Sequence, residues 1–182
     1  RTFIKVVAPI LTKVYNESKE IHGHLPESLR QGIISVLYKK KEREDPRNYR
    51  PITLLNNDYK ILMRILTVRM NEAAVQFTSA PQNGFAPDSF IGENLMLLKL
   101  LQTYIEDENE EAMFLFADME KAFDRASWEF MDRALTALGL DSFRSYFCLA
   151  YSHTNPPSRR VYVNGHLSEP FNIESGVAQG CP

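Results

Sequence analysis

Apolar residues recur along the chain with two spacings, one typical of helices and one typical of strands. Spacings of three and four, which place side chains on one helix face, predict helices at residues 2–20, 56–77 and 90–105. Residues that favour helix ends predict two more, at 127–138 and at 141–151, where Asp141 opens the helix. Ser127 is a favoured N-terminal cap, and Gly139 is a favoured C-terminal cap of the same helix. Pro9 either kinks the first helix or marks its beginning.

Short β-branched and aromatic runs predict strands between these helices. The run GIISVLY at residues 32–38 is one, and a second begins at Tyr49 after a charged loop. Further along, two short apolar runs flank Asn164-Gly165, a dipeptide that favours a tight hairpin turn. The order of elements predicts an α+β fold in which helices pack on a small antiparallel sheet.

The segment AMFLFADMEKAFDRASW, residues 112–128, changes character in its middle. Its apolar residues 113–117 predict a buried strand that ends at Asp118, and helix formers with interspersed charges follow. A carboxylate at the end of a buried strand has a rigid support at the sheet edge, where a ligand can reach it. Asp is also common at the start of turns, so the local pattern leaves Asp118 open between the two roles.

The composition, 44% hydrophobic and 24% charged residues in a chain of 182, fits one globular domain or two small ones that share a core. The net charge is −2, but residues 30–50 hold seven Lys or Arg against three acids, and five of residues 106–111 are acidic. The two cysteines favour a reducing compartment over a disulfide framework. No apolar run reaches the roughly 18 residues that cross a bilayer, so no membrane partner is expected.

Basic residues concentrate in the predicted hairpin loop, where lysines 39–41 and Arg50 would lie near each other. Arg offers a planar fork of donors and Lys a point charge, so such a hairpin suits a polyphosphate. A solvated surface turn accounts for the same charges, and the local pattern favours that simpler interpretation. His22 and His24 have no further histidine or cysteine nearby, which argues against a zinc site there.

Four motifs in register along the chain resemble those of the reverse transcriptases of non-LTR, LINE-type retrotransposons. They are LYKKK with NYRPITLLNNDYKIL, then QNGF, then FADMEKAFDRASW, and finally VNG with GVAQGCP. Each motif alone is weak, but their order and spacing are specific and cover about residues 25–182. Group II intron maturases share the right-hand fold and are the nearest alternative, but the NYRPI and KAFD motifs, with Trp128 downstream, favour the retrotransposon type.

The resemblance implies catalytic and metal-binding roles after the predicted strand. Asp118 matches the first catalytic aspartate of the polymerase palm, the ligand of both of two Mg²⁺ ions, and the backbone carbonyl of Met119 would bind one of them. Such hard cations prefer carboxylate and carbonyl oxygens, and together they activate the attacking hydroxyl and neutralise the leaving pyrophosphate. Asp124 and Lys121 lie in the same motif, and we expect structural roles for both.

The resemblance also implies contacts to the nucleotide. Arg50 and one lysine of residues 39–41 match contacts to the triphosphate; simple alignment favours Lys40, although strand alternation sends it to the face opposite its two neighbours. Phe123 matches the ring that packs under the incoming sugar and leaves no room for a 2′-hydroxyl, and Gln179 matches a residue along the nucleotide pocket. The expected partners are deoxynucleoside triphosphates, an RNA template and a DNA primer.

The fold implied by the resemblance is a right-hand polymerase. Residues 1–88 would form helical fingers with a β hairpin and an N-terminal extension, and residues 89–182 an incomplete antiparallel palm sheet packed on helices. The Tyr-x-Asp-Asp type motif, the rest of the palm and the thumb are not in the sequence, and the first residue is not Met. We therefore expect a piece of a longer protein that does not polymerise alone. Without the missing hairpin, residues 112–118 would form an exposed sheet edge.

One departure from the family pattern and one alternative function remain. Ser89 stands where the family has an arginine, which puts a template or primer contact there in doubt. The second hypothesis is a non-enzymatic remnant of a decayed element that binds RNA or a partner. The polymerase is favoured because the matched side chains are all present: Asp118, Phe123, Arg50 and Gln179. The family leads us to expect the nucleus or the cytoplasm, without a choice between them.

Overall fold

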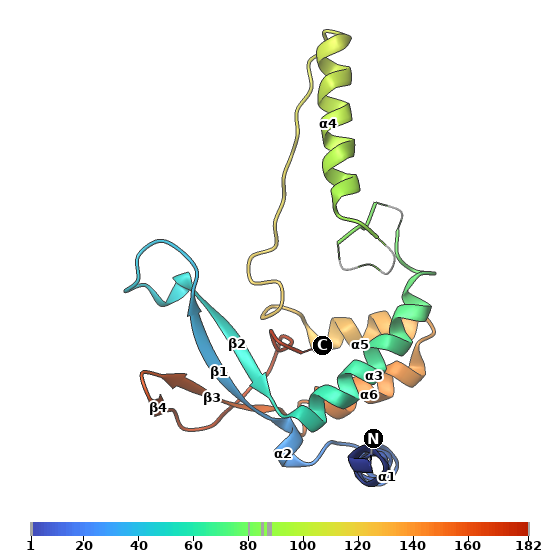
Figure 1. Cartoon of the computed structure of the whole chain (residues 1–182), viewed down its shortest axis with the longest axis vertical. Coiled ribbons are helices and arrows are strands. Elements are labelled where there is room, and N and C mark those ends of the chain that lie inside the picture. The colour runs from blue at the N-terminus through green and yellow to red at the C-terminus, as the bar shows by residue number, and fades with distance from the viewer. Residues whose placement is uncertain (1, 80, 85, 87–88, 182) are drawn as a thin grey trace. The chain divides into compact units, whose positions relative to one another are not determined.

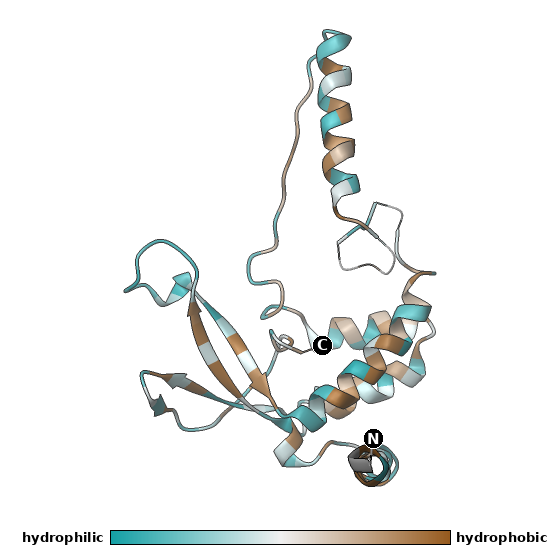
Figure 2. Cartoon of the chain, viewed as in Figure 1, coloured by the Kyte–Doolittle hydropathy of each residue, from teal (hydrophilic) through white to brown (hydrophobic). Residues whose placement is uncertain are grey.

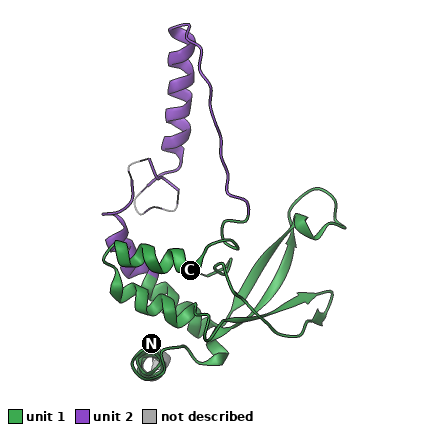
Figure 3. Ribbon diagram, turned by 180° about the vertical axis from the view of Figure 1, so that it is seen from behind, with its two compact units in different colours: residues 1–66, 121–182 green, residues 67–120 purple. Residues whose placement is uncertain are grey.

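The computed structural model describes residues 2–79, 81–84, 86 and 89–181, with the backbone alone for residues 2 and 3. Phe85 of the QNGF motif therefore lies outside the described residues. The chain forms two compact units, one of residues 1–66 and 121–182 and one of residues 67–120 (Figure 3). These units do not follow the boundary at residue 88 between the predicted fingers and palm, and that assignment stays a prediction.

The first unit contains a five-stranded sheet that joins the two ends of the sequence. Its strands are β1 (Gln31–Tyr38), β2 (Tyr49–Leu55), β3 (Ser158–Val163), β4 (His166–Leu167) and β5 (Phe171–Asn172). The order is β2-β1-β3-β4 (Figure 1). Strand β5 also pairs with β3. Because β1 and β3 run parallel, the sheet is mixed, and the prediction of an antiparallel sheet was wrong in this respect.

Both predicted hairpins are confirmed. Strands β1 and β2 pair antiparallel from Gly32 opposite Leu55 to Tyr38 opposite Tyr49. The loop between them contains a short 3₁₀ turn, Pro46–Asn48, and it is closed by a hydrogen bond from the Lys39 amide to the Asn48 carbonyl (2.9 Å). In the β3–β4 hairpin, Asn164 and Gly165 both have positive φ (51° and 84°), as a tight type I′ turn requires.

The predicted helices of the first unit are present within a few residues of their predicted ends. They are α1 (Thr2–Glu17), which contains Pro9 and continues into a π-helical turn (Ser18–His22), α3 (Asn57–Ala74, which runs on into the second unit), α5 (Trp128–Ala137) and α6 (Asp141–Ala150). Ser127 caps α5 by accepting a hydrogen bond from the Phe130 amide, and Gly139 has the expected positive φ. The single turn α2 (Glu27–Arg30) was missed because four residues carry no periodic signal.

The core of the first unit lies between these helices and one end of the sheet. It consists mainly of large apolar side chains: Tyr15, Leu25, Leu29, Leu55, Tyr59, Leu62, Trp128, Leu149, Ala150 and Tyr151. Figure 2 shows apolar bands in both β1 and β2, and Leu55 at the end of β2 is part of the core. The core thus joins residues from both ends of the chain, and this explains why residues 1–66 and 121–182 form one unit.

The second unit consists of one helix and an extended segment. Helix α4 (Gly92–Asp107) confirms the prediction for residues 90–105, but none of its residues is buried. The predicted buried strand is wrong: residues 111–119 form no strand, and Met113, Leu115 and Phe116 are 91%, 89% and 78% exposed. A strand requires a neighbour to satisfy its backbone groups, and no strand in the described part of the chain pairs with this segment. Asp118 is accordingly exposed.

Within the described residues, none of the helices is both long and apolar enough to span a bilayer.

Removing a buried side chain from the core should destabilise the first unit. Leu25 is fully buried, and its amide donates a hydrogen bond to the Leu149 carbonyl (3.3 Å). Leu25→Ala leaves a cavity, and we expect it to lower the free energy of unfolding by about 2–5 kcal/mol, measured by urea denaturation. Ile21→Ala, at a nearby exposed position, is the control and should change it by less than about 0.5 kcal/mol. Equal effects of the two substitutions would contradict this core.

Candidate functional site

The loop that contains Gln179 runs along the free edge of β2. The amide of Thr53 on β2 donates a hydrogen bond to the Gln179 carbonyl (2.8 Å). A Cβ atom at Gly180 would lie 2.9 Å from the Thr53 carbonyl oxygen, closer than side-chain atoms approach backbone, so glycine permits the contact. The edge strand is therefore covered by the loop rather than left open to solvent.

The other end of this loop is fastened to the segment that contains Phe123. The amide of Gly176 donates to the Ala126 carbonyl (2.8 Å), and the amide of Val177 donates to the Phe123 carbonyl (2.8 Å). The indole Nε1 of Trp128 donates to the Gly176 carbonyl (2.7 Å). We call residues 176–180 the strap, because they connect β2 to residues 123–128 through backbone hydrogen bonds.

A hollow of about 310 Å³ lies beside the strap and is lined by basic side chains. Its walls contain Lys39, Arg50 and Lys121, with Arg47 next to them. Arg47 forms an ion pair with Asp45 (2.9 Å), and this carboxylate compensates part of the positive charge of Arg47. The remaining side chains in the wall are Val36, Pro46, Tyr49, Pro51, Asp124 and Gln179. Four cations around one carboxylate favour an anionic ligand, and a polyphosphate suits this combination of Arg and Lys donors.

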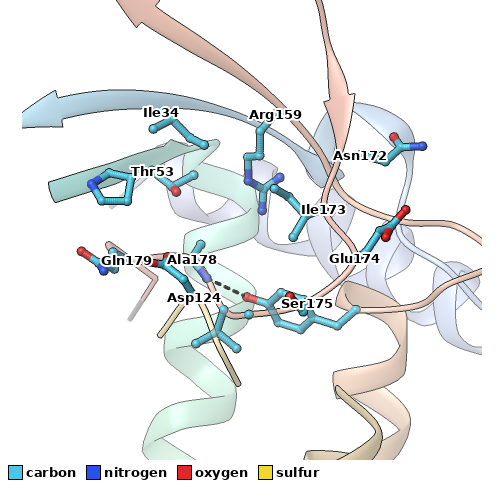
Figure 4. Close-up of a pocket in the computed structure, with 14 residues that line it drawn as sticks. Ile34, Thr53, Asp124, Arg159, Asn172, Ile173, Glu174, Ser175, Ala178 and Gln179 are labelled. Atoms are coloured by element: carbon cyan, nitrogen blue, oxygen red, sulfur yellow. Dashed lines mark hydrogen bonds between the residues drawn. The ribbon is translucent and has the colours of Figure 1, made fainter. Parts of the chain in front are cut away.

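A second hollow of about 350 Å³ (Figure 4) shares Gln179 and Asp124 in its wall with the basic hollow. Its wall on the sheet includes Thr53 and Arg159. The Arg159 side chain is 5% exposed, and its Nη1 donates to the carbonyls of Arg30 and Ser158 (both 2.7 Å). Burial lowers the pKa of the Arg159 guanidinium below its ordinary value. The hydrogen bonds to the two carbonyls therefore help to stabilise its charged form.

The strap is anchored to the core beneath this second hollow. The Ala178 amide donates to the Tyr151 hydroxyl (3.4 Å), drawn as the dashed line in Figure 4. Burial raises the pKa of the Tyr59 phenol and of the Cys181 thiol above their ordinary values, which keeps both groups neutral near pH 7. The base of the strap is thus a packed environment of neutral hydroxyl and thiol groups, and the buried Arg159 guanidinium interacts with them.

Comparisons with known proteins agree with this arrangement of motifs. A family described as "Reverse transcriptase (RNA-dependent DNA polymerase)" matches residues 38–182. The chain belongs to the reverse transcriptase family. It is 33% identical over 165 residues to the Pol polyprotein from type-1 retrotransposable element R2 of Popillia japonica, covering 89% of the chain and 22% of that protein.

Two further relatives also come from transposons. The chain is 31% identical over 175 residues to the Transposon TX1 uncharacterized 149 kDa protein of Xenopus laevis, covering 95% of the chain and 13% of that protein. It is 31% identical over 176 residues to the probable RNA-directed DNA polymerase from transposon X-element of Drosophila melanogaster, covering 93% of the chain and 19% of that protein. The predicted resemblance to the reverse transcriptases of non-LTR retrotransposons is confirmed, and the chain spans about a fifth or less of these relatives' length.

The structure brings together several of the side chains predicted from the family motifs. Arg50 and Gln179 line the same basic hollow. Phe123 is half exposed and is held through its carbonyl to the strap that carries Gln179. Lys39 lines the hollow, whereas Lys40 is exposed in the loop beyond β1. Which lysine contacts a triphosphate stays a prediction.

Asp118 and Met119 belong to the second unit, where both are exposed. The Asp118 carboxylate and the Met119 carbonyl are oxygen donors of the kind that Mg²⁺ prefers, so their chemistry fits the predicted ion. Among the described residues, no three His, Cys, Asp or Glu side chains are grouped so that they could hold a metal ion. The predicted two-ion site therefore requires donors beyond this pair.

The structure brings three further residues of this motif to the same region. Lys121 and Asp124 both line the basic hollow, and the structural roles expected for them stay a prediction. Lys121 also has a positive φ (51°), which is uncommon for a residue with a Cβ atom. Trp128 was used only as a family marker, although it is buried and bonded to the strap. All three residues lie in the same sequence motif, which marks the segment as important. The motif alone does not show whether a given side chain packs in the core or contacts a ligand.

A side chain at Gly176 should loosen the strap. Gly176 has φ +82°, and an added Cβ would lie 2.6 Å from the Asp124 carbonyl oxygen, whereas at Gly23 (φ +69°) it would meet nothing within 4 Å. Gly23→Ala therefore measures the backbone strain alone, about 1–2 kcal/mol. We expect Gly176→Ala to lower the free energy of unfolding by at least about 1 kcal/mol more than Gly23→Ala, measured by urea denaturation. Equal losses would mean that Gly176 is not pressed against Asp124.

Proposed function

We propose that this chain forms the nucleotide-binding part of an RNA-directed DNA polymerase of a non-LTR retrotransposon. The observation that carries the proposal is the basic hollow that contains Arg50, Lys39, Lys121 and Gln179. Arg50 and Gln179 are far apart in the sequence, and each was assigned to the nucleotide from a different motif. Their presence in one hollow supports a single binding site for the triphosphate end of a nucleotide.

The basic side chains neutralise the phosphates of the incoming nucleotide. The Arg50 guanidinium donates to two phosphate oxygens at once, and a lysine of the hairpin, Lys40 by alignment, adds a point charge. Charge builds up on the pyrophosphate as it leaves, so cations placed around it stabilise the transition state. The charged β1–β2 hairpin acts as the arm that brings these donors to the nucleotide.

Phe123 selects the sugar. A ring beneath C2′ leaves no space for a 2′-hydroxyl, and it therefore rejects a ribonucleotide by steric exclusion. A hydrogen bond could not make this choice, because the correct substrate is the one that lacks the hydroxyl. Gln179 lies along the pocket and contacts the same nucleotide from the strap.

Asp118 and the Met119 carbonyl would hold Mg²⁺ in the polymerase. When bound, the two ions lower the pKa of the attacking 3′-hydroxyl and neutralise the leaving group. One carboxylate is too few for two ions, so the remaining ligands come from elsewhere in the polymerase, and the chain alone does not polymerise. The template is RNA and the primer is DNA; residues 1–88 act as fingers and residues 89–182 as part of the palm of a right-hand fold.

Removing the predicted metal ligand should abolish synthesis without abolishing RNA binding. In the full-length protein that carries this chain, we expect Asp118→Ala to reduce RNA-templated primer extension to background. RNA binding rests on many phosphate contacts, so the dissociation constant should stay close to that of the wild type. Glu110→Ala, in the nearby acidic loop, is the control and should leave extension intact. Extension by the Asp118 variant at the wild-type rate would overturn the proposal.

Removing the predicted phosphate contact should weaken nucleotide binding. A hydrogen bond to a charged group contributes about 1.5–3 kcal/mol, so Arg50→Ala should raise the KM for deoxynucleotides about ten- to a hundredfold. Arg43→Ala is the matched control, because Arg43 is in the same loop but its guanidinium stacks on the Tyr38 ring (4.9 Å). Steady-state primer extension measures both, and an equal KM for the two variants would remove Arg50 from the site.

A further inference from the structure

Trp128 provides the side-chain hydrogen bond between the strap and the segment that carries Phe123. Its side chain is 4% exposed and packs against the rings of Tyr151 and His153 (centroids 5.6 Å and 4.9 Å away). Its indole Nε1 donates to the Gly176 carbonyl (2.7 Å), in the interior. Leaving a buried carbonyl without a donor destabilises the folded state, so this hydrogen bond holds the first residue of the strap in place.

Two backbone hydrogen bonds continue the link directly to Phe123. The Gly176 amide donates to Ala126 and the Val177 amide donates to Phe123 (both 2.8 Å). The space between the two segments is so small that a Cβ at Gly176 would meet the Asp124 carbonyl. The backbone of Phe123 therefore cannot move independently of the start of the strap.

The far end of the strap is also held by a backbone hydrogen bond. Gln179 accepts a hydrogen bond from the Thr53 amide on β2, the strand on which Arg50 also lies. The strap thus fixes the distance between Phe123 at one end and the β2 edge at the other. A shift at Gly176 changes the position of Phe123 relative to Gln179, because both are attached to the same short loop.

We propose that Trp128 is a positioning residue for nucleotide selection. Its indole N–H holds the strap at Gly176, and the strap sets the place of the Phe123 ring relative to Gln179. Trp128 acts through Gly176 and does not touch the nucleotide. The inference rests on the proposed function, since it takes Phe123 as the residue that excludes the 2′-hydroxyl.

The N–H group distinguishes this role from ordinary packing in the core. A purely structural tryptophan would contribute through the apolar area of its ring, which a ring of equal shape would replace. A positioning tryptophan requires the donor as well. The informative substitution therefore removes the N–H and keeps the ring.

The test replaces Trp128 by 3-benzothienylalanine, in which sulfur stands in place of the N–H, in the full-length protein. Primer extension on an RNA template gives kcat/KM for a deoxynucleotide and for the matching ribonucleotide. We expect the ratio of the two to fall by about three- to tenfold, the effect of one buried hydrogen bond. The change should lie in KM, because the strap positions the nucleotide and takes no part in the chemistry.

Tyr15→Phe is the matched control, because it removes another hydrogen bond of an aromatic side chain, from the Tyr15 hydroxyl to the Asp58 carbonyl (2.6 Å). It should lower stability and leave the selectivity ratio unchanged. An unchanged ratio in the Trp128 variant, or the same change in the control, overturns the positioning role. If the wild-type protein does not extend primers at all, the proposed function fails instead, and the two failures are distinguishable.

A second variant tests the same link without altering the core, should the first fail to fold. Replacing Val177 by its α-hydroxy analogue converts one amide to an ester and removes the N–H that donates to the Phe123 carbonyl. The selectivity ratio should fall in the same direction. A folded ester variant with the wild-type ratio would overturn the link between the strap and Phe123.

Discussion

The free edge of β2 imposes the constraint on which the first unit depends. An edge strand presents unpaired amides and carbonyls, and here Thr53 satisfies one of them by pairing with Gln179. The loop can approach because Gly180 has no Cβ and because Gly176 has none at the other end. Trp128 completes the arrangement from the core. The contact at the sheet edge thus holds Gln179 against β2, the strand on which Arg50 also lies.

Local elements were predictable from the sequence, and long-range pairing was not. Helices α3, α5 and α6 and both hairpins have their signals in consecutive residues, in caps, periodicity and the Asn164-Gly165 turn. The parallel pairing of β1 with β3 has no such signal, because its partners come from opposite ends of the sequence. The strand predicted at residues 113–117 failed for the same reason: its apolar residues suit a strand, but a strand also requires a neighbour.

The candidate site was predictable to the level of motifs. The family motifs predicted Arg50 and Gln179 as nucleotide contacts, and in the structure both residues line the same hollow. Alignment favoured Lys40 among lysines 39–41, whereas the structure lines the hollow with Lys39, because this position depends on where β1 ends and how the chain turns. The motif also suggested a structural role for Lys121. A lysine that follows a predicted strand has the same local sequence pattern whether its side chain faces solvent or lines a hollow. Only the tertiary arrangement distinguishes these cases.

The parallel pairing of β1 with β3 has a consequence for the order of events during biosynthesis. Arg30 and Arg159, joined by a hydrogen bond at the start of these strands, are 129 residues apart. At about 5–20 residues per second, a ribosome needs roughly 6 to 26 seconds to make the second strand after the first. During that interval the newly made β1–β2 hairpin has a bare edge and an unfilled apolar face. Nascent chains of this kind are natural clients of chaperones, and faster translation of the intervening residues would shorten their exposure.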